Sequence, residues 1–310
     1  MRALVTGATG CLGRALVEEL SLHGWNLRTT ARTPADLPDF MAADLVTSDL
    51  RPILKGVDVV FHCAALSSAW GSEAEFIAAN VTATRRLLQA AEDAGAMRFV
   101  FASTPSLYAD GTDRLDVAEN APLPARCVTP YAHSKRLAER MVLAADGGMR
   151  CNAIRPRAIY GRHDRSLLPR LFQAMRRGMV PMIGGGHALI DVTHRRDAAR
   201  AMILAASGPG GRVWNVTSGR AFAFRDLVEI AGRRSGLRFR SPRIPYSLAM
   251  SLATTAETMA RWRGGAEPAL TRQAVASLGR SLTLDITAAR RDLGYKPLVG
   301  FEEGLQECFA

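Results

Sequence analysis

A glycine-rich turn between a predicted strand and a predicted helix constrains the fold of this chain more than any other feature. The turn comprises residues 6–13, TGATGCLG, between an apolar run at residues 3–5 and a helical pattern at residues 14–22. Gly7 permits a tight turn, Gly10 lets backbone amides approach a pyrophosphate, and Gly13 lets the helix pack closely. The positive end of that helix would face the phosphates. We therefore predict a dinucleotide site, since a chance match to three glycines would lack the flanking strand and helix.

The rest of the chain alternates strand-like and helix-like segments. Before Gly161, the patterns predict strands at residues 26–31, 57–62, 98–102 and 150–154 and helices at residues 73–94 and 131–145. Such alternation is typical of an α/β fold with a Rossmann-type, doubly wound parallel sheet. After Gly161 the alternation fades, with predicted helices at residues 167–177, 193–206, 224–235 and 286–293 and a strand at residues 212–216.

This pattern predicts two interleaved parts. Residues 1–165 form the dinucleotide-binding domain, and residues 166–310 form a smaller, mainly substrate-binding part. Within the second part, residues 193–217 are expected to return to the Rossmann sheet.

Composition narrows the class of protein. The five cysteines have neither metal-ligand nor redox spacing, so we predict no metal site and reduced thiols. The formal net charge of +11 comes mainly from dispersed arginines without interleaved aromatic residues, which argues against a nucleic-acid partner. Met1 leads straight into the first predicted strand, so we expect a cytoplasmic protein.

A second group of residues suggests proton transfer. Tyr131 and Lys135 are four positions apart on a predicted helix and therefore share one face. A nearby ammonium favours the phenolate, so we expect Lys135 to lower the pKa of Tyr131. At the end of a predicted strand, either Thr104 or Ser103 could hydrogen-bond a substrate oxygen. An ordinary tyrosine–lysine helix pair is the alternative, which the glycine turn disfavours.

Taken together, these motifs resemble the extended short-chain dehydrogenase/reductase family, also known as the NAD(P)-dependent epimerase/dehydratase superfamily. The resemblance covers nearly the whole chain, and it rests on TGATGCLG, Asp44-Leu45, His62-Cys-Ala-Ala65, Asn80-Val81, the segment ending at Tyr108, Tyr131 to Lys135, Arg155-Pro156 and Ile159-Tyr160-Gly161.

The resemblance implies a role for each matching residue. Tyr131 would be the general acid/base, and Lys135 would lower its pKa and hold the nicotinamide ribose. Thr104 would be the hydroxyl partner, with Ser106 as the weaker alternative. Asp44 would meet the adenine. Cofactor contacts would come from Gly7, Thr9, Gly10, Cys11, Leu12, Gly13, Arg32, Asp44, Leu45, Cys63, Ala64, Ala65, Asn80, Ser103, Tyr131, Lys135, Pro156, Ala158 and Ile159.

The end of the second predicted strand bears on the choice of cofactor. NAD enzymes usually place a carboxylate there for the ribose hydroxyls, whereas this chain has Arg32. A guanidinium can pair with a 2′-phosphate, which favours NADP over NAD. The alternatives are that Arg32 is an ordinary surface residue and that NAD is used.

Two departures from the sugar-nucleotide members of the family bear on the substrate. Those members commonly place asparagine where this chain has Ala158 and arginine where it has Ile190, and both groups help to hold a nucleotide diphosphate. Residues 184–193, 215–224 and 292–297 instead resemble the 3β-hydroxysteroid dehydrogenase-like subgroup. The resemblance implies a secondary alcohol or ketone on an apolar skeleton, sterol-like or a β-hydroxy or β-keto acid.

Three functions follow as hypotheses. The leading one is an NADP-dependent oxidoreductase for an apolar alcohol or ketone. The second is a nucleotide-sugar epimerase or dehydratase, and the third is a non-catalytic cofactor-binding regulator.

The resemblance also suggests a homodimer packed through the predicted helices at residues 73–94 and 131–145. Residues 244–262 contain too many polar groups to span a membrane, so they are expected to form a core helix, a lid or a reversible membrane contact.

Overall fold

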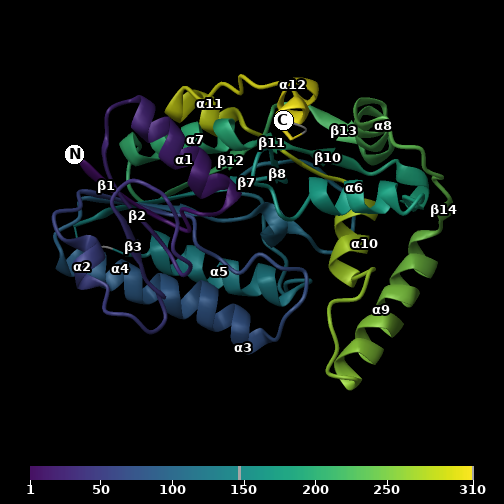
Figure 1. Ribbon diagram of the computed structural model, residues 1–310, viewed down its shortest axis with the longest axis horizontal. Helices are drawn as coiled ribbons and strands as arrows, with labels where there is room; N and C mark the ends of the chain where they lie inside the picture. Colours follow the sequence, from purple (N-terminus) through teal and green to yellow (C-terminus); the bar gives the residue numbers. More distant parts are fainter. Residues whose placement is uncertain (146–147, 309–310) are drawn as a thin grey trace.

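A seven-stranded parallel sheet forms the centre of the molecule (Figure 1). The computed structural model describes residues 1–145 and 148–308. The strand order is β12-β7-β5-β4-β1-β2-β3. The strands are β1 (Arg2–Thr6), β2 (Asn26–Ala31), β3 (Phe40–Ala42), β4 (Val59–His62), β5 (Arg98–Ala102), β7 (Arg150–Pro156) and β12 (Arg212–Val216). This arrangement confirms the predicted Rossmann-type fold.

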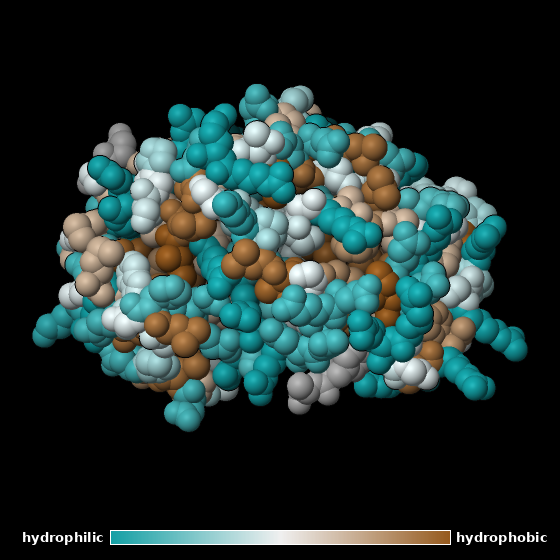
Figure 2. Space-filling view, turned by 90° about the horizontal axis from the view of Figure 1, so that it is seen from above, coloured by the Kyte–Doolittle hydropathy of each residue, from teal (hydrophilic) through white to brown (hydrophobic). Residues whose placement is uncertain are grey.

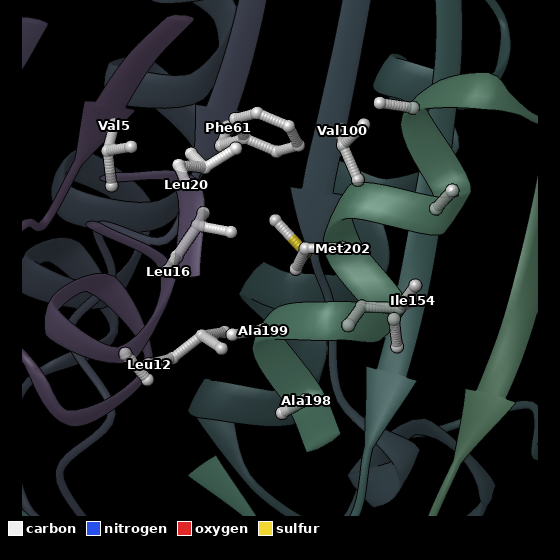
Figure 3. Packing of buried hydrophobic residues seen from close by; sticks show 14 of the residues in the cluster. Val5, Leu12, Leu16, Leu20, Phe61, Val100, Ile154, Ala198, Ala199 and Met202 are labelled. Atoms are coloured by element: carbon white, nitrogen blue, oxygen red, sulfur yellow. The ribbon is translucent and has the colours of Figure 1, made fainter. Parts of the chain in front are cut away.

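Helices cover both faces of the sheet, as the near-continuous apolar strands require. On one face, α1 (Cys11–Leu22), α7 (Arg195–Ser207) and α11 (Thr287–Leu293) pack on the strands. Leu12, Leu16 and Leu20 of α1 face Ala199 and Met202 of α7, and Phe61 of β4 lies beside Leu20 (Figure 3). On the other face lie α2 (Arg51–Leu54), α4 (Ala83–Asp93) and α5 (Pro130–Leu143).

Two predicted helices differ from the structure at their ends or centre. The segment expected as one helix at residues 73–94 consists of α3 (Glu73–Phe76), a π-helical turn η1 (Ile77–Thr82) and α4. The π turn surrounds Asn80, whose side chain is bonded outside the helix. Residues Thr193–His194 form strand β11 beside β8 (Ile159–Tyr160), so α7 begins only at Arg195.

A smaller part extends beyond the carboxyl ends of the central strands. Its four-stranded sheet has the order β13-β10-β15-β6. These strands are β6 (Arg114–Val117), β10 (Leu189–Asp191), β13 (Ala221–Ala223) and β15 (Leu282–Leu284). A third core lies among α6 (Leu168–Arg176), α8 (Phe224–Ser235) and α12 (Phe301–Gln306). The smaller part also contains the short segments η3 (Gly184–Gly186), β9 (Met182–Ile183) and β14 (Arg243–Ile244).

Helices α9 (Tyr246–Trp262) and α10 (Arg272–Gly279) lie side by side and project from the body of the molecule (Figure 1). Within α9 only Ala249, Ala253 and Glu257 are buried, and Trp262 at its end is 86% exposed. The expectation of a core helix for residues 244–262 is therefore wrong, because this helix packs along one narrow stripe. Among residues 1–145 and 148–308, no helix is long and apolar enough to cross a membrane.

One broad face of the molecule is predominantly hydrophilic. Seen from above the view of Figure 1, polar residues surround separate hydrophobic patches, and no continuous hydrophobic band crosses the face (Figure 2).

Candidate active site

Parallel strands bring the predicted site residues to one edge of the central sheet. The glycine turn follows β1, Cys63–Ala65 follow β4, and Ser103 and Thr104 follow β5. Strand β1 lies between β2 and β4, so the chain order reverses between β1 and β4. In sheets of this kind ligands bind outside the carboxyl ends of the strands at that reversal.

The glycine turn has the shape that a pyrophosphate requires. Gly7 has a φ of +64°, and a Cβ there would lie 2.6 Å from the Ala64 backbone nitrogen. A Cβ on Gly13 would lie 2.2 Å from the Gly7 carbonyl oxygen, whereas one on Gly10 would meet only that oxygen at 3.3 Å. No side chain caps the amino end of α1. Backbone atoms therefore fill the space beside Gly7 and Gly13, whereas no side chain caps the first amides of α1. This arrangement fits the pyrophosphate of a dinucleotide.

The side chains beside this turn leave the contact with a cofactor mostly to the backbone. Leu12 and Leu45 lie in the two cores that flank the sheet, and their cofactor contacts stay predictions. Burial raises the pKa of both the Cys11 and the Cys63 thiol to about 12, and each therefore stays protonated. Thr9 lies in the turn itself.

Arg32 and Asp44 lie after β2 and β3, the two strands on the far side of β1. Arg32 is exposed, and no hydrogen bond or ion pair of its side chain is found within the described ranges. Arg28, by contrast, pairs with Asp39 at 3.0 Å and donates to the Pro52 carbonyl oxygen at 2.6 Å. Asp44 Oδ1 accepts from the Val46 amide at 2.8 Å. Of the two arginines, only Arg32 is free to meet an anion.

The predicted proton-transfer residues meet at the start of α5. Thr129 caps this helix and accepts a hydrogen bond from the Ala132 amide, which places Tyr131 in the first turn. The Thr104 hydroxyl is near enough to the Tyr131 phenol to lower its pKa, and it donates to Ser106 Oγ at 3.1 Å. Thr104 and Ser106 therefore both belong to this hydroxyl cluster.

Lys135 is one turn further along α5 and is buried. Its Nζ donates to the Ala102 carbonyl oxygen at 2.6 Å and lies 3.8 Å from the centroid of the Phe101 ring. Burial lowers the pKa of Lys135 to about 7, with Glu139 opposing the shift. Burial also raises the pKa of Tyr131, opposed by the Thr104 hydrogen bond. The expected lowering of the Tyr131 pKa by Lys135 is thus absent here, because the ammonium is held at the end of β5.

The side chain of Asn80 makes three hydrogen bonds within the protein. Its Oδ1 accepts from the Leu66 amide at 2.8 Å, and its Nδ2 donates to the Leu66 carbonyl oxygen at 3.1 Å and to Ser134 Oγ at 2.9 Å. Asn80 therefore has a positioning role, and its cofactor contact stays a prediction. Asn80 ties the loop after β4 to α5, the helix of Tyr131 and Lys135.

The positions where sugar-nucleotide enzymes carry polar groups are apolar in this structure. Ala158 follows the end of β7 with a φ of +44°, and Ile159 begins β8. Ile190 is buried in the core of the smaller part. Pro156, the last residue of β7, is buried at the same edge of the sheet. Ser103 is also buried there, and its hydroxyl has no hydrogen-bond partner within the described ranges.

A buried ion pair anchors the helix that carries Tyr131. Arg155 of β7 binds both carboxylate oxygens of Glu139 on α5, and the two side chains are 5% and 3% exposed. Arg155 also donates to the Tyr108 hydroxyl, which itself donates to Asn215 Oδ1 of β12 at 3.0 Å. Sequence reasoning missed this network, and its only local signal is an arginine inside an apolar strand.

Comparison with known proteins assigns the chain to a family. The family model of the NAD dependent epimerase/dehydratase family matches residues 3–217. The chain belongs to this family.

Among the residues that the structure describes, no group of three or more His, Cys, Asp or Glu side chains is arranged to hold a metal ion.

Named relatives extend the match over the whole chain. A ketoreductase of Stigmatella aurantiaca, named for 4-hydroxy-2-methyl-3-oxo-4-farnesyl-3,4-dihydroquinoline-1-oxide, is 38% identical and covers 98% of this chain and 95% of its own. A 2-alkyl-3-oxoalkanoate reductase of Stenotrophomonas maltophilia is 33% identical, and the match covers 100% of this chain and 99% of the reductase. Relatives also include 3-beta-hydroxysteroid dehydrogenase of Mycolicibacterium neoaurum, which confirms the predicted subgroup resemblance.

A solved structure of MoeE5 in complex with UDP-glucose and NAD has a TM-score of 0.79 and 30% identity, and covers 99% of this chain and 97% of its own. The family member described here is therefore an NAD(P)-dependent enzyme of the short-chain dehydrogenase/reductase type.

Proposed function

We propose that this enzyme interconverts a secondary alcohol and a ketone on an apolar substrate, with NADP as its cofactor. The observation that supports this most is the Thr104–Tyr131 hydroxyl pair, which lies with Lys135 at the same sheet edge as the glycine turn. When bound, the nicotinamide supplies or accepts the hydride.

The chain's own residues would handle the proton. Tyr131 donates its phenolic proton to the carbonyl oxygen during reduction and accepts one from the alcohol during oxidation. Thr104 hydrogen-bonds the same phenol and orients it. Lys135, released from the Ala102 carbonyl oxygen, would bind the nicotinamide ribose and stabilise the phenolate by its charge.

Apolar residues at the sugar-nucleotide positions favour an oxidoreductase over an epimerase or dehydratase. Ala158 and the buried Ile190 cannot hydrogen-bond or neutralise a diphosphate. The names of the ketoreductase and 2-alkyl-3-oxoalkanoate reductase relatives agree with an apolar ketone substrate.

Absorbance at the nicotinamide band tests the proposal, with purified protein, NADPH and a panel of apolar ketones and nucleotide sugars. Net oxidation of NADPH by an apolar ketone is the expected result. Binding of a nucleotide sugar with tightly retained cofactor and no net turnover would assign the epimerase reaction instead.

Removing the Arg32 guanidinium should abolish the preference for NADP. We expect Arg32→Ala to weaken NADP binding on the order of 10-fold or more, because a charge-assisted pair with the 2′-phosphate is lost. Its affinity for NAD should change little. Calorimetric titration with each cofactor measures both dissociation constants, with Arg28→Lys as a control for an arginine change within β2, the strand that Arg32 follows. Equal loss for the two cofactors would contradict the assignment.

We further propose a cytoplasmic homodimer packed through α4 and α5. All five cysteines are free thiols, which agrees with a reducing compartment. Helices α4 and α5 lie side by side on one face of the molecule, as a symmetric dimer contact requires (Figure 1). Gel filtration with light scattering should give twice the mass of 33.5 kDa, and a monomer would contradict the dimer.

A further inference from the structure

A pocket lies beside the hydroxyl cluster of Thr104, Ser106 and Tyr131. Ser106 lines it, as does Thr129, the residue that caps α5 two positions before Tyr131. The opposite wall comes from the smaller part of the molecule, where α10 contributes Gln273, Ala276 and Ser277. The pocket therefore lies between the segments next to Thr104 and Tyr131 and the second part of the chain.

Arg157 is the unusual residue of this pocket. It follows the last residue of β7 and is only 8% exposed, yet its Nε has no hydrogen-bond partner. Within residues 1–145 and 148–308, no hydrogen bond or ion pair of its guanidinium is found. Asp191 attracts it through space, but Asp191 Oδ2 is occupied by the Leu284 amide at 2.7 Å.

The two other arginines of the pocket already have partners. Arg114 donates to the carbonyl oxygens of Tyr108 at 2.9 Å and Pro122 at 3.3 Å. Arg280 also has a buried Nε without a hydrogen-bond partner, but its guanidinium lies 3.5 Å from an Asp113 carboxylate oxygen and 4.2 Å from the centroid of the Tyr246 ring. Among the arginines of the pocket, Arg157 is therefore the one for which no ion pair is found within the described ranges.

A buried guanidinium without a partner is costly unless an anion completes it. The planar fork of arginine matches a carboxylate with two parallel hydrogen bonds, and one positive charge balances one carboxylate. Hydroxyl and apolar groups of the pocket, among them Thr129, Ala276 and Leu282, would contact the uncharged, carbon-rich remainder of the molecule.

We propose that Arg157 binds a carboxylate of the substrate, so that the enzyme acts on a β-hydroxy or β-keto acid and not on a neutral sterol-like alcohol. This inference rests on the proposed function and assigns its substrate class. It makes Arg157 a specificity-determining residue, since the carboxylate would be held in the pocket while the β oxygen faces Tyr131.

The test compares NADP-dependent oxidation of a medium-chain 3-hydroxy acid with that of its 3-hydroxy amide, which has nearly the same shape and no charge. We expect the native enzyme to prefer the acid on the order of 10- to 100-fold in kcat/KM. Arg157→Met should lose that factor for the acid while its rate with the amide changes less than about threefold. Arg157→Lys keeps the positive charge but not the planar guanidinium, so its preference for the acid should lie between those of the native enzyme and Arg157→Met.

Arg177→Met is the matched control, because Arg177 is exposed and outside the pocket. It removes the same net charge and should leave the acid-to-amide ratio unchanged. A native enzyme that uses amide and acid equally well would overturn the carboxylate site while the proposed oxidoreductase function stands. Net turnover of neither compound, nor of any apolar ketone, would overturn both. The native comparison decides even where Arg157→Met fails to fold.

Discussion

The Tyr131→Phe variant is expected to lose between about 10²- and 10⁴-fold of kcat in both directions, because no other group replaces its proton. The substitution removes one oxygen and leaves a ring that still packs 6.3 Å from the Phe76 ring, measured between centroids. Cofactor affinity should therefore change little. Steady-state kinetics measure the loss, and calorimetry with NADP measures the retained binding.

Tyr160→Phe provides the matched control for this prediction. Tyr160 is fully buried, and its hydroxyl makes only a long hydrogen bond of 3.4 Å to the Gly300 carbonyl oxygen. The same chemical change there should leave kcat within about threefold. If Tyr131→Phe kept more than about one-tenth of the native kcat, Tyr131 would not be the proton donor. Another group would then transfer the proton, or the chain would be the non-catalytic regulator.

The pH dependence gives a second readout of the same residue. Oxidation needs Tyr131 as phenolate, so its rate should rise with pH, whereas reduction needs the phenol and should fall. The raised pKa of Tyr131 places this change in the alkaline range for protein without cofactor. Charge from Lys135 beside a bound cofactor would move it toward neutral pH. In Tyr131→Phe both slopes should disappear.

Glu139→Ala is expected to destabilise the fold by about 3–5 kcal/mol, since it leaves the Arg155 guanidinium buried without its carboxylate. Both side chains are almost fully buried, and the pair joins α5 to β7. Because α5 carries Tyr131 and Lys135, the residual folded protein should also lose activity. Urea unfolding of the native protein and the variant measures the difference in free energy.

Two further variants separate the buried pair from ion pairs in general. Glu267→Ala removes the carboxylate that pairs with Arg170 at the surface, and we expect a loss below about 1 kcal/mol. The double variant Glu139→Leu with Arg155→Met replaces both charges by apolar groups and should be less destabilised than Glu139→Ala alone. A loss below about 1 kcal/mol for Glu139→Ala would show that water or another group compensates Arg155.

Local sequence patterns were sufficient for the parts of the molecule that depend on neighbouring residues. The spacing of the glycines predicted the geometry of the turn. The backbone atoms that leave no room for a Cβ at Gly7 and Gly13 belong to the same β–α unit and to the segment after the adjacent strand. Strands β2, β5 and β12 have the predicted bounds. Strand β5, RFVFA, is nearly continuous in apolar residues, as is typical of a buried parallel strand. The four-residue spacing likewise predicted that Tyr131 and Lys135 lie one helical turn apart.

Contacts between distant segments were decided only by the tertiary structure. The strands β10, β13 and β15 of the second sheet have three residues each, too few to show a period. Tyr108 and Asn215 meet across 107 residues of sequence, and Asn80 reaches Ser134 across 54. The unpartnered state of Arg157 also depends on which side chains α10 and β15 bring to the pocket. The sequence by itself determined the cofactor fold and predicted the residues proposed for proton transfer, because their signals are local. Packing between distant segments decided which buried charge lacks a partner.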